Sequence, residues 1–190
     1  PKLLTNRIES GGCLVAASAA ALTVGRLTLP VYEIYKVGQP LHWAEGTDIL
    51  GYFGLDLVVV PHWNNAEGGN HDTRFCFMGA ERFARLQDLI PDSVAVLGID
   101  EHTALVIDLN NQEAFVKGIG RVTLRQGLRE RIFFKGDTLS LSMLRGETTA
   151  QATHRRETDI EQAPAEDQPP DAPAWKRLHA LENDFIEHLE

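Results

Sequence analysis

The 190-residue sequence has only two cysteines, Cys13 and Cys76, and no Cys-x-x-Cys pair. Two cysteines do not build a disulfide framework, so we expect a protein of a reducing, cytoplasmic compartment. No apolar run approaches the roughly twenty residues that are needed to span a bilayer. The sequence therefore predicts no membrane partner.

Basic residues are also few, with 18 Lys and Arg against 27 Asp and Glu. No basic stripe is present, so no nucleic-acid partner is expected. The paired glycines match no phosphate-binding loop, and the sequence predicts no cofactor. Residues 147–190 hold eleven acidic and four basic residues, which accounts for seven of the nine net negative charges. The acidity belongs to the tail.

This charge distribution predicts three parts of the chain. The whole sequence is 43% hydrophobic, enough for the core of one α/β domain, which we expect over residues 1–146. Residues 147–173 are rich in Glu, Gln, Pro, Ala and Thr, which is typical of a flexible linker. Residues 174–190 predict an amphipathic helix, because apolar residues recur at helical spacing: Trp175, Leu178, Leu181, Phe185 and Ile186.

One serine interrupts the apolar and alanine-rich run of residues 12–22. The pattern predicts a nucleophile elbow, in which a buried strand over residues 13–17 ends at Ser18 and a helix follows. Small residues at Ala16 and Ala20 suit such a tight turn, although glycine is the preferred residue there. The alternative is that Ser18 only caps a core helix.

Two further apolar segments predict buried strands, residues 56–60 and 94–98. The first leads into His62 and the second into Glu101. Because functional loops of parallel sheets follow the carboxyl ends of the strands, we expect the two side chains at one edge of the sheet, together with Ser18.

These motifs resemble the serine peptidase family that contains aspartyl dipeptidase and cyanophycinase, over roughly residues 11–144. The family's Gly-x-Ser-Ala-Gly-Ala turn corresponds to residues 16–21, with alanine in place of both glycines. Its histidine motif corresponds to Pro61-His62-Trp63. An arginine-bearing helix follows at residues 81–86, and then a Gly-Leu-x-Glu turn at residues 98–101.

The resemblance implies a class I glutamine amidotransferase-like (flavodoxin-like) fold with a parallel sheet. It implies that His62 activates Ser18 and that Glu101 orients the imidazole. The Ala19 amide and a donor from an earlier glycine-containing loop would form the oxyanion hole. Only seventeen residues precede Ser18, so we expect the C-terminal part of a larger domain, completed by a missing N-terminal segment or a partner chain. The sequence leaves open whether the chain forms a homo-oligomer.

The polar loop after His62 holds two candidate substrate-binding residues, Asn64 and Arg74. Family enzymes act on aspartyl-containing substrates, whose carboxylate a guanidinium would bind. Alternatively, Arg74 pairs with Asp72 or Glu67. A metal site is a further, less favoured interpretation, for which the ligands would come from separate loops: His62, His71, Asp72 and His102.

The remaining segments predict β-structure. Residues 29–38 alternate like an edge strand. Four alternating segments separated by glycines predict a C-terminal antiparallel β-meander: residues 113–117, 121–125, 131–135 and 138–144.

Two functions fit these observations. One is a serine hydrolase that cleaves a small peptide or amide through Ser18, His62 and Glu101. The other is an inactive domain on the same scaffold, which serves binding or assembly. The alanines in the elbow motivate the second.

Overall fold

A computed structural model describes residues 2–146 of the chain. The predicted linker and terminal helix, residues 147–173 and 174–190, lie outside the described residues. The helices of the described part are α1 (Lys2–Glu9), α2 (Ala19–Thr23), α3 (Val31–Tyr35), α4 (Ile49–Tyr52), α5 (Gly79–Gln87) and α6 (Leu141–Leu144). None of the helices in residues 2–146 is long and apolar enough to cross a membrane.

The first sheet has the order β3-β4-β7-β8, from the strands β3 (Leu57–Val60), β4 (Ala95–Ile99), β7 (Arg121–Gln126) and β8 (Arg129–Phe134). β3 and β4 are parallel, in the register Leu57 to Ala95, whereas β7 and β8 are antiparallel to their neighbours. The two predicted buried strands are therefore confirmed. The predicted parallel sheet is limited to this one pair among the described strands.

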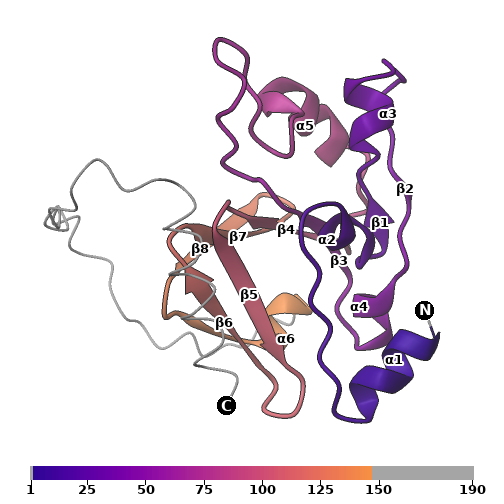
Figure 1. The fold of residues 1–190 in the computed structure, drawn as a ribbon, viewed down its shortest axis with the longest axis vertical. Coiled ribbons are helices and arrows are strands. Elements are labelled where there is room, and N and C mark those ends of the chain that lie inside the picture. Colours follow the sequence, from indigo (N-terminus) through magenta and orange to yellow (C-terminus); the bar gives the residue numbers. More distant parts are fainter. Residues whose placement is uncertain (1, 147–190) are drawn as a thin grey trace, which may run out of the picture. The chain divides into compact units, whose positions relative to one another are not determined.

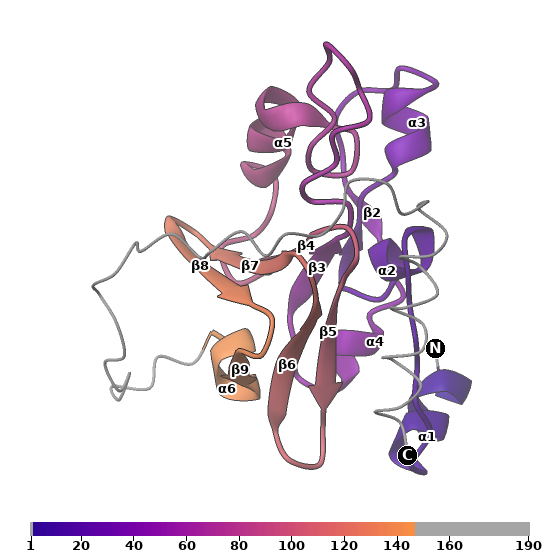
Figure 2. The same ribbon diagram turned by 60° about the vertical axis from the view of Figure 1, so that its left-hand side comes forward.

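A second sheet has the order β5-β6-β9, from β5 (Thr103–Asp108), β6 (Glu113–Gly118) and β9 (Thr138–Ser140). β5 and β6 form a long hairpin (Figure 2). The predicted meander is correct in its antiparallel strands but wrong as one continuous sheet. β7 pairs with β4 rather than with β6, and residues 141–144 turn into α6.

Side chains of β3 point alternately into two apolar clusters, as a strand covered on both faces requires. Leu57 and Val59 belong to the cluster shared with the second sheet and α6. Val58 and Val60 belong to the cluster under α5 and α3. All four are at most 3% exposed. This rigid pair of strands carries the loops of the site.

The prediction of an edge strand over residues 29–38 is wrong, because residues 31–35 form α3. Val31 and Ile34 are one helical turn apart and face the cluster under α5. Tyr32 and Tyr35 face outward, 68% and 38% exposed. Helical spacing of three thus explains the apolar pattern better than alternation. The short strands β1 (Leu27–Thr28) and β2 (Ala44–Glu45) flank this region and pair antiparallel.

The predicted buried strand before Ser18 is also wrong. Residues 12–17 form no strand, and Cys13, Leu14 and Val15 are exposed. Within residues 2–146, no backbone hydrogen bond involves residues 13–16. A strand needs a ladder partner, and composition alone does not supply one. α2 nevertheless lies against β3 (Figure 1).

Candidate active site

Ser18 lies at the N-terminal boundary of α2, where its backbone is strained. Its φ of 49° and ψ of −120° lie outside the regions that L-residues favour. Such a turn exposes the side chain of the residue at its tip, which is the geometry that a nucleophile elbow requires. This strained turn forms with Ala16 and Ala20 in place of glycines, although no strand precedes it among the described residues.

His62 follows β3 by two residues, and its backbone is also left-handed, with φ of 53°. Its carbonyl oxygen accepts hydrogen bonds from the amides of Asn65 and Cys76, both at 3.2 Å. Cys76 is the centre of a turn, Phe75–Phe77, in which all three φ angles are positive. The strained turn thus holds the strained histidine in place.

Trp63 anchors the same loop to the sheet. Its amide donates to the Ile99 carbonyl of β4 at 3.1 Å, and its ring meets Phe75 and Phe83 edge to face. Gly98 leaves room for the indole, since a Cβ there would lie 2.3 Å from Trp63. The end of β3 is therefore locked to the end of β4.

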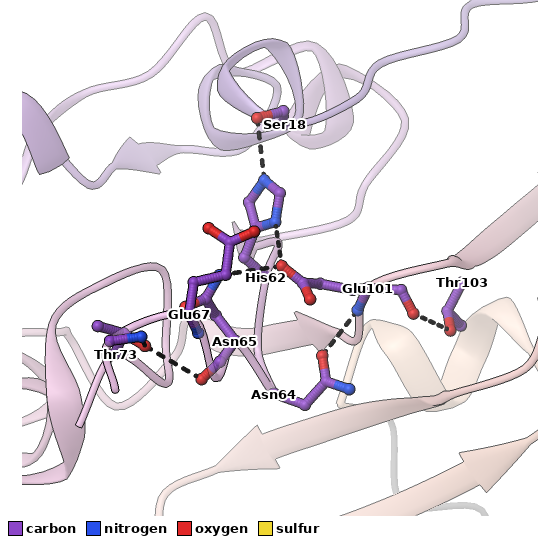
Figure 3. A network of polar contacts seen from close by, with 9 residues as sticks. Ser18, His62, Asn64, Asn65, Glu67, Thr73, Glu101 and Thr103 are labelled. Atoms are coloured by element: carbon purple, nitrogen blue, oxygen red, sulfur yellow. Dashed lines mark hydrogen bonds and ion pairs between the residues drawn. The ribbon is translucent and has the colours of Figure 1, made fainter. Parts of the chain in front are cut away.

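The structure brings together the three residues that the sequence singled out (Figure 3). Ser18 Oγ lies 3.0 Å from His62 Nε2, and His62 Nδ1 lies 3.1 Å from Glu101 Oε1. With the proton on Nδ1, the imidazole donates to Glu101 and Nε2 accepts the serine proton. Both distances lie within the range of working nucleophile and base pairs. The arrangement supports proton transfer from the serine hydroxyl.

Besides His62, two adjacent asparagines form hydrogen bonds with Glu101. Asn65 Nδ2 lies 3.0 Å from the same Oε1, and the Glu101 amide donates to Asn64 Oδ1 at 2.8 Å. Partial burial raises the pKa of Glu101, but the hydrogen bonds from Asn65 and His62 outweigh it, so the net pKa lies below its usual value. The carboxylate is thereby kept ionised.

Ala19, the predicted oxyanion donor, is the first residue of α2. Its amide makes no backbone hydrogen bond within the described part of the chain. A free amide directly after the serine suits an oxyanion hole. The second donor, which the resemblance places in an earlier glycine-containing loop, stays a prediction.

The two predicted substrate-binding residues make structural contacts. Arg74 binds Asp72 with both arms of its guanidinium, Nε to Oδ1 at 2.9 Å and Nη2 to Oδ2 at 2.8 Å. This is the alternative in which Arg74 pairs within its own loop. Asn64 holds the Glu101 backbone. A role of either in binding substrate stays a prediction.

The histidines and carboxylates of the polar loop do not converge on one point. Among residues 2–146, no three His, Cys, Asp or Glu side chains are grouped closely enough to hold a metal ion. Cys76 is buried, which raises the pKa of its thiol to about 12. Such a thiol is a poor nucleophile.

Sequence reasoning missed Asn65, which is 1% exposed and central to the network in Figure 3. The available signal was a pair of adjacent amides directly after a buried strand, Asn64-Asn65. Asparagine in a polar loop usually only forms turns, so this pair does not by itself indicate a site.

No protein-family model and no curated protein matches the sequence. Among solved structures, the chain is similar to a peptidase from an acI-B1 Actinobacterium, with a TM-score of 0.51 and 24% sequence identity. The match covers 70% of this chain and 47% of that one, so the chain spans less than half the length of the peptidase. At this identity the likeness shows a shared fold.

Proposed function

We propose that the chain is a peptidase-like serine hydrolase, in which Ser18 is the nucleophile, His62 the general base and Glu101 the residue that orients the imidazole. The observation that carries the proposal is the continuous hydrogen-bonded chain from Ser18 Oγ through His62 to Glu101 Oε1. The strained backbone of Ser18 supports it independently. The fold shared with a peptidase agrees with it.

The proposed reaction proceeds through an acyl-enzyme. Ser18 Oγ attacks the carbonyl carbon of an amide while its proton passes to His62 Nε2. The tetrahedral oxyanion faces the Ala19 amide. Its collapse breaks the carbon–nitrogen bond, and His62 returns the proton to the leaving amine. A water molecule, deprotonated by His62, then hydrolyses the Ser18 ester and restores the hydroxyl.

The substrate class that we propose is a small peptide or another amide. Membership in the family of aspartyl dipeptidase and cyanophycinase rests on the order of the motifs around Ser18, His62 and Glu101. A preference for aspartyl-containing substrates is carried by that resemblance alone, because the Arg74 guanidinium is engaged by Asp72.

An active-site-directed fluorophosphonate tests the proposal on the full chain. We expect one covalent adduct, on Ser18, that is absent from Ser18→Ala. In His62→Ala, the labelling rate should fall by about a thousandfold, as in other hydrolases that lose their base. Ser10→Ala is the matched control, since the exposed Ser10 hydroxyl donates to the Arg7 carbonyl and contacts no histidine among the described residues. An adduct that persists in Ser18→Ala contradicts the proposal.

A second function, a non-catalytic domain for binding or assembly, is favoured by one observation. Residues 13–16 present apolar side chains and backbone groups without hydrogen-bond partners among the described residues. Such a segment suits a protein contact. Folded protein that shows no fluorophosphonate adduct would support this function over the hydrolase.

A further inference from the structure

The most deeply buried polar side chain of the site is one to which the proposed mechanism gives no role. Asn65 is 1% exposed, and both ends of its carboxamide are engaged. Nδ2 donates to Glu101 Oε1 at 3.0 Å, and Oδ1 accepts from the Glu67 amide at 3.2 Å. A buried amide with both functions satisfied is rigid, since any rotation would leave a buried polar atom unpaired.

The contact to Glu101 is made at the oxygen that matters for the imidazole. Glu101 Oε1 accepts from His62 Nδ1 and from Asn65 Nδ2, at 3.1 and 3.0 Å. With His62 as its sole donor, the carboxylate would be free to turn about its side-chain torsions. The second donor defines its position. Because Asn64 also fixes the Glu101 backbone, two adjacent amides hold this residue at both ends.

We propose that Asn65 is a positioning residue of the triad, which holds Glu101 Oε1 in line with His62 Nδ1 and thereby fixes the imidazole toward Ser18. The inference rests on the proposed hydrolase function. In this role, the polar loop after β3 connects Glu101, in the turn after β4, to His62 through hydrogen bonds.

The charges around Glu101 set the expected pH response. The groups that face it are the imidazoles of His62 and His102 and the adjacent carboxyl of Asp100. Burial of Glu101 favours its neutral form, and the Asn65 hydrogen bond is the first of the contacts that oppose this. Without that donor, the pKa of Glu101 should rise.

Asn65→Asp keeps the acceptor for the Glu67 amide and replaces the donor that faces Glu101 by a carboxyl oxygen, which removes the hydrogen bond and adds an ionisable group beside the carboxylate. We expect the maximal rate of fluorophosphonate labelling at Ser18 to fall about ten- to a hundredfold, with an unchanged half-saturating concentration. The pKa of Glu101, followed by carbon NMR of its carboxyl group, should rise. If Asn65→Asp does not fold, Asn65→Ala removes the same donor without adding a charge.

Thr73→Val is the matched control. Thr73 Oγ1 bonds the Asn65 carbonyl and the Gly68 amide within the same loop but does not touch Glu101. Its labelling rate should stay within about threefold of the wild type, since it loosens the loop alone. Equal losses in Thr73→Val and Asn65→Asp would overturn the inference, as would an Asn65→Asp protein with wild-type labelling.

The two proposals fail separately. Wild-type protein without a Ser18 adduct would contradict the hydrolase proposal. The titration of Glu101 would still test the hydrogen bond from Asn65 that positions its carboxylate. A Glu101 pKa that is the same in the wild type and in Asn65→Asp would overturn the role of Asn65 whatever the labelling shows.

Discussion

Two apolar segments lead into the two residues that meet in the site, and they differ in nearly every structural respect. Residues 57–60 form β3, pair with β4 and are at most 3% exposed. Residues 13–16 pair with nothing in the described chain, and Leu14 and Val15 are 38% and 71% exposed. Each segment is nevertheless followed, two residues on, by a residue with positive φ: His62 after residues 57–60 and Ser18 after residues 13–16.

The difference shows that strained backbones at a site are supported in different ways. His62 is held from outside its own segment, by the amides of Asn65 and Cys76. Ser18 is held by the helix that follows it, since the Leu22 amide bonds the Ser18 carbonyl at 3.2 Å. The conformation of Ser18 therefore depends on α2, and that of His62 depends on a loop that is bonded to the sheet.

Hydrogen exchange should give the largest difference between the two segments. Amides of residues 13–16 have no acceptor in the described chain. The β3 amides that are bonded to β4, by contrast, reach solvent only when the core unfolds. We expect the slowest β3 amides to exchange at least about a thousandfold more slowly, measured by NMR or mass spectrometry of the full chain. Comparable protection of both segments would show that residues 13–16 acquire a partner.

Matched leucine truncations should give the next largest difference. Leu57 is fully buried, so Leu57→Ala should lower the free energy of unfolding by about 2–5 kcal/mol. Leu14→Ala removes the same atoms from a side chain that is 38% exposed, and should cost less than about 1 kcal/mol. Urea unfolding of both variants measures these free energies. Equal losses would show that the two segments contribute equally to the core.

Adjacent carboxyls at the end of β4 offer the smallest and sharpest test. The pKa of Glu101 is lowered, so its ionised form stabilises the fold above about pH 4.5, and that stability is lost as the pH falls. Burial raises the pKa of Asp100, so its neutral form stabilises the fold below pH 3.8, and that stability is lost as the pH rises.

Urea unfolding between pH 3 and pH 7 separates the two carboxyls. The destabilisation caused by Glu101→Gln should grow with rising pH, whereas Asp100→Asn should become relatively more stable over the same range. Parallel pH profiles for the two variants would show that the environments of the two neighbours do not differ.

Features with a local signal were predictable from the amino-acid sequence. The apolar run at 57–60, in which three of the four residues are β-branched, predicted a buried strand that leads into His62. The meeting of Ser18, His62 and Glu101 was instead predicted from the order of the strand ends and the family resemblance. Short-range chemistry also predicted a tight turn at Ser18, because small residues surround it. These features depend on neighbours along the chain, which the sequence displays directly.

The remaining features depend on contacts between segments that are far apart in the sequence. An apolar run becomes a strand when a partner lies within hydrogen-bonding distance, so residues 57–60 pair and residues 13–16 do not. Two sheets form instead of one meander because β7 pairs with β4 rather than with β6. Asn65 reaches Glu101, 36 residues away, through a loop whose path no periodicity records. Contacts between distant segments depend on the packing of the whole domain. For this reason the sequence did not predict the residues that hold His62 and Glu101 in place.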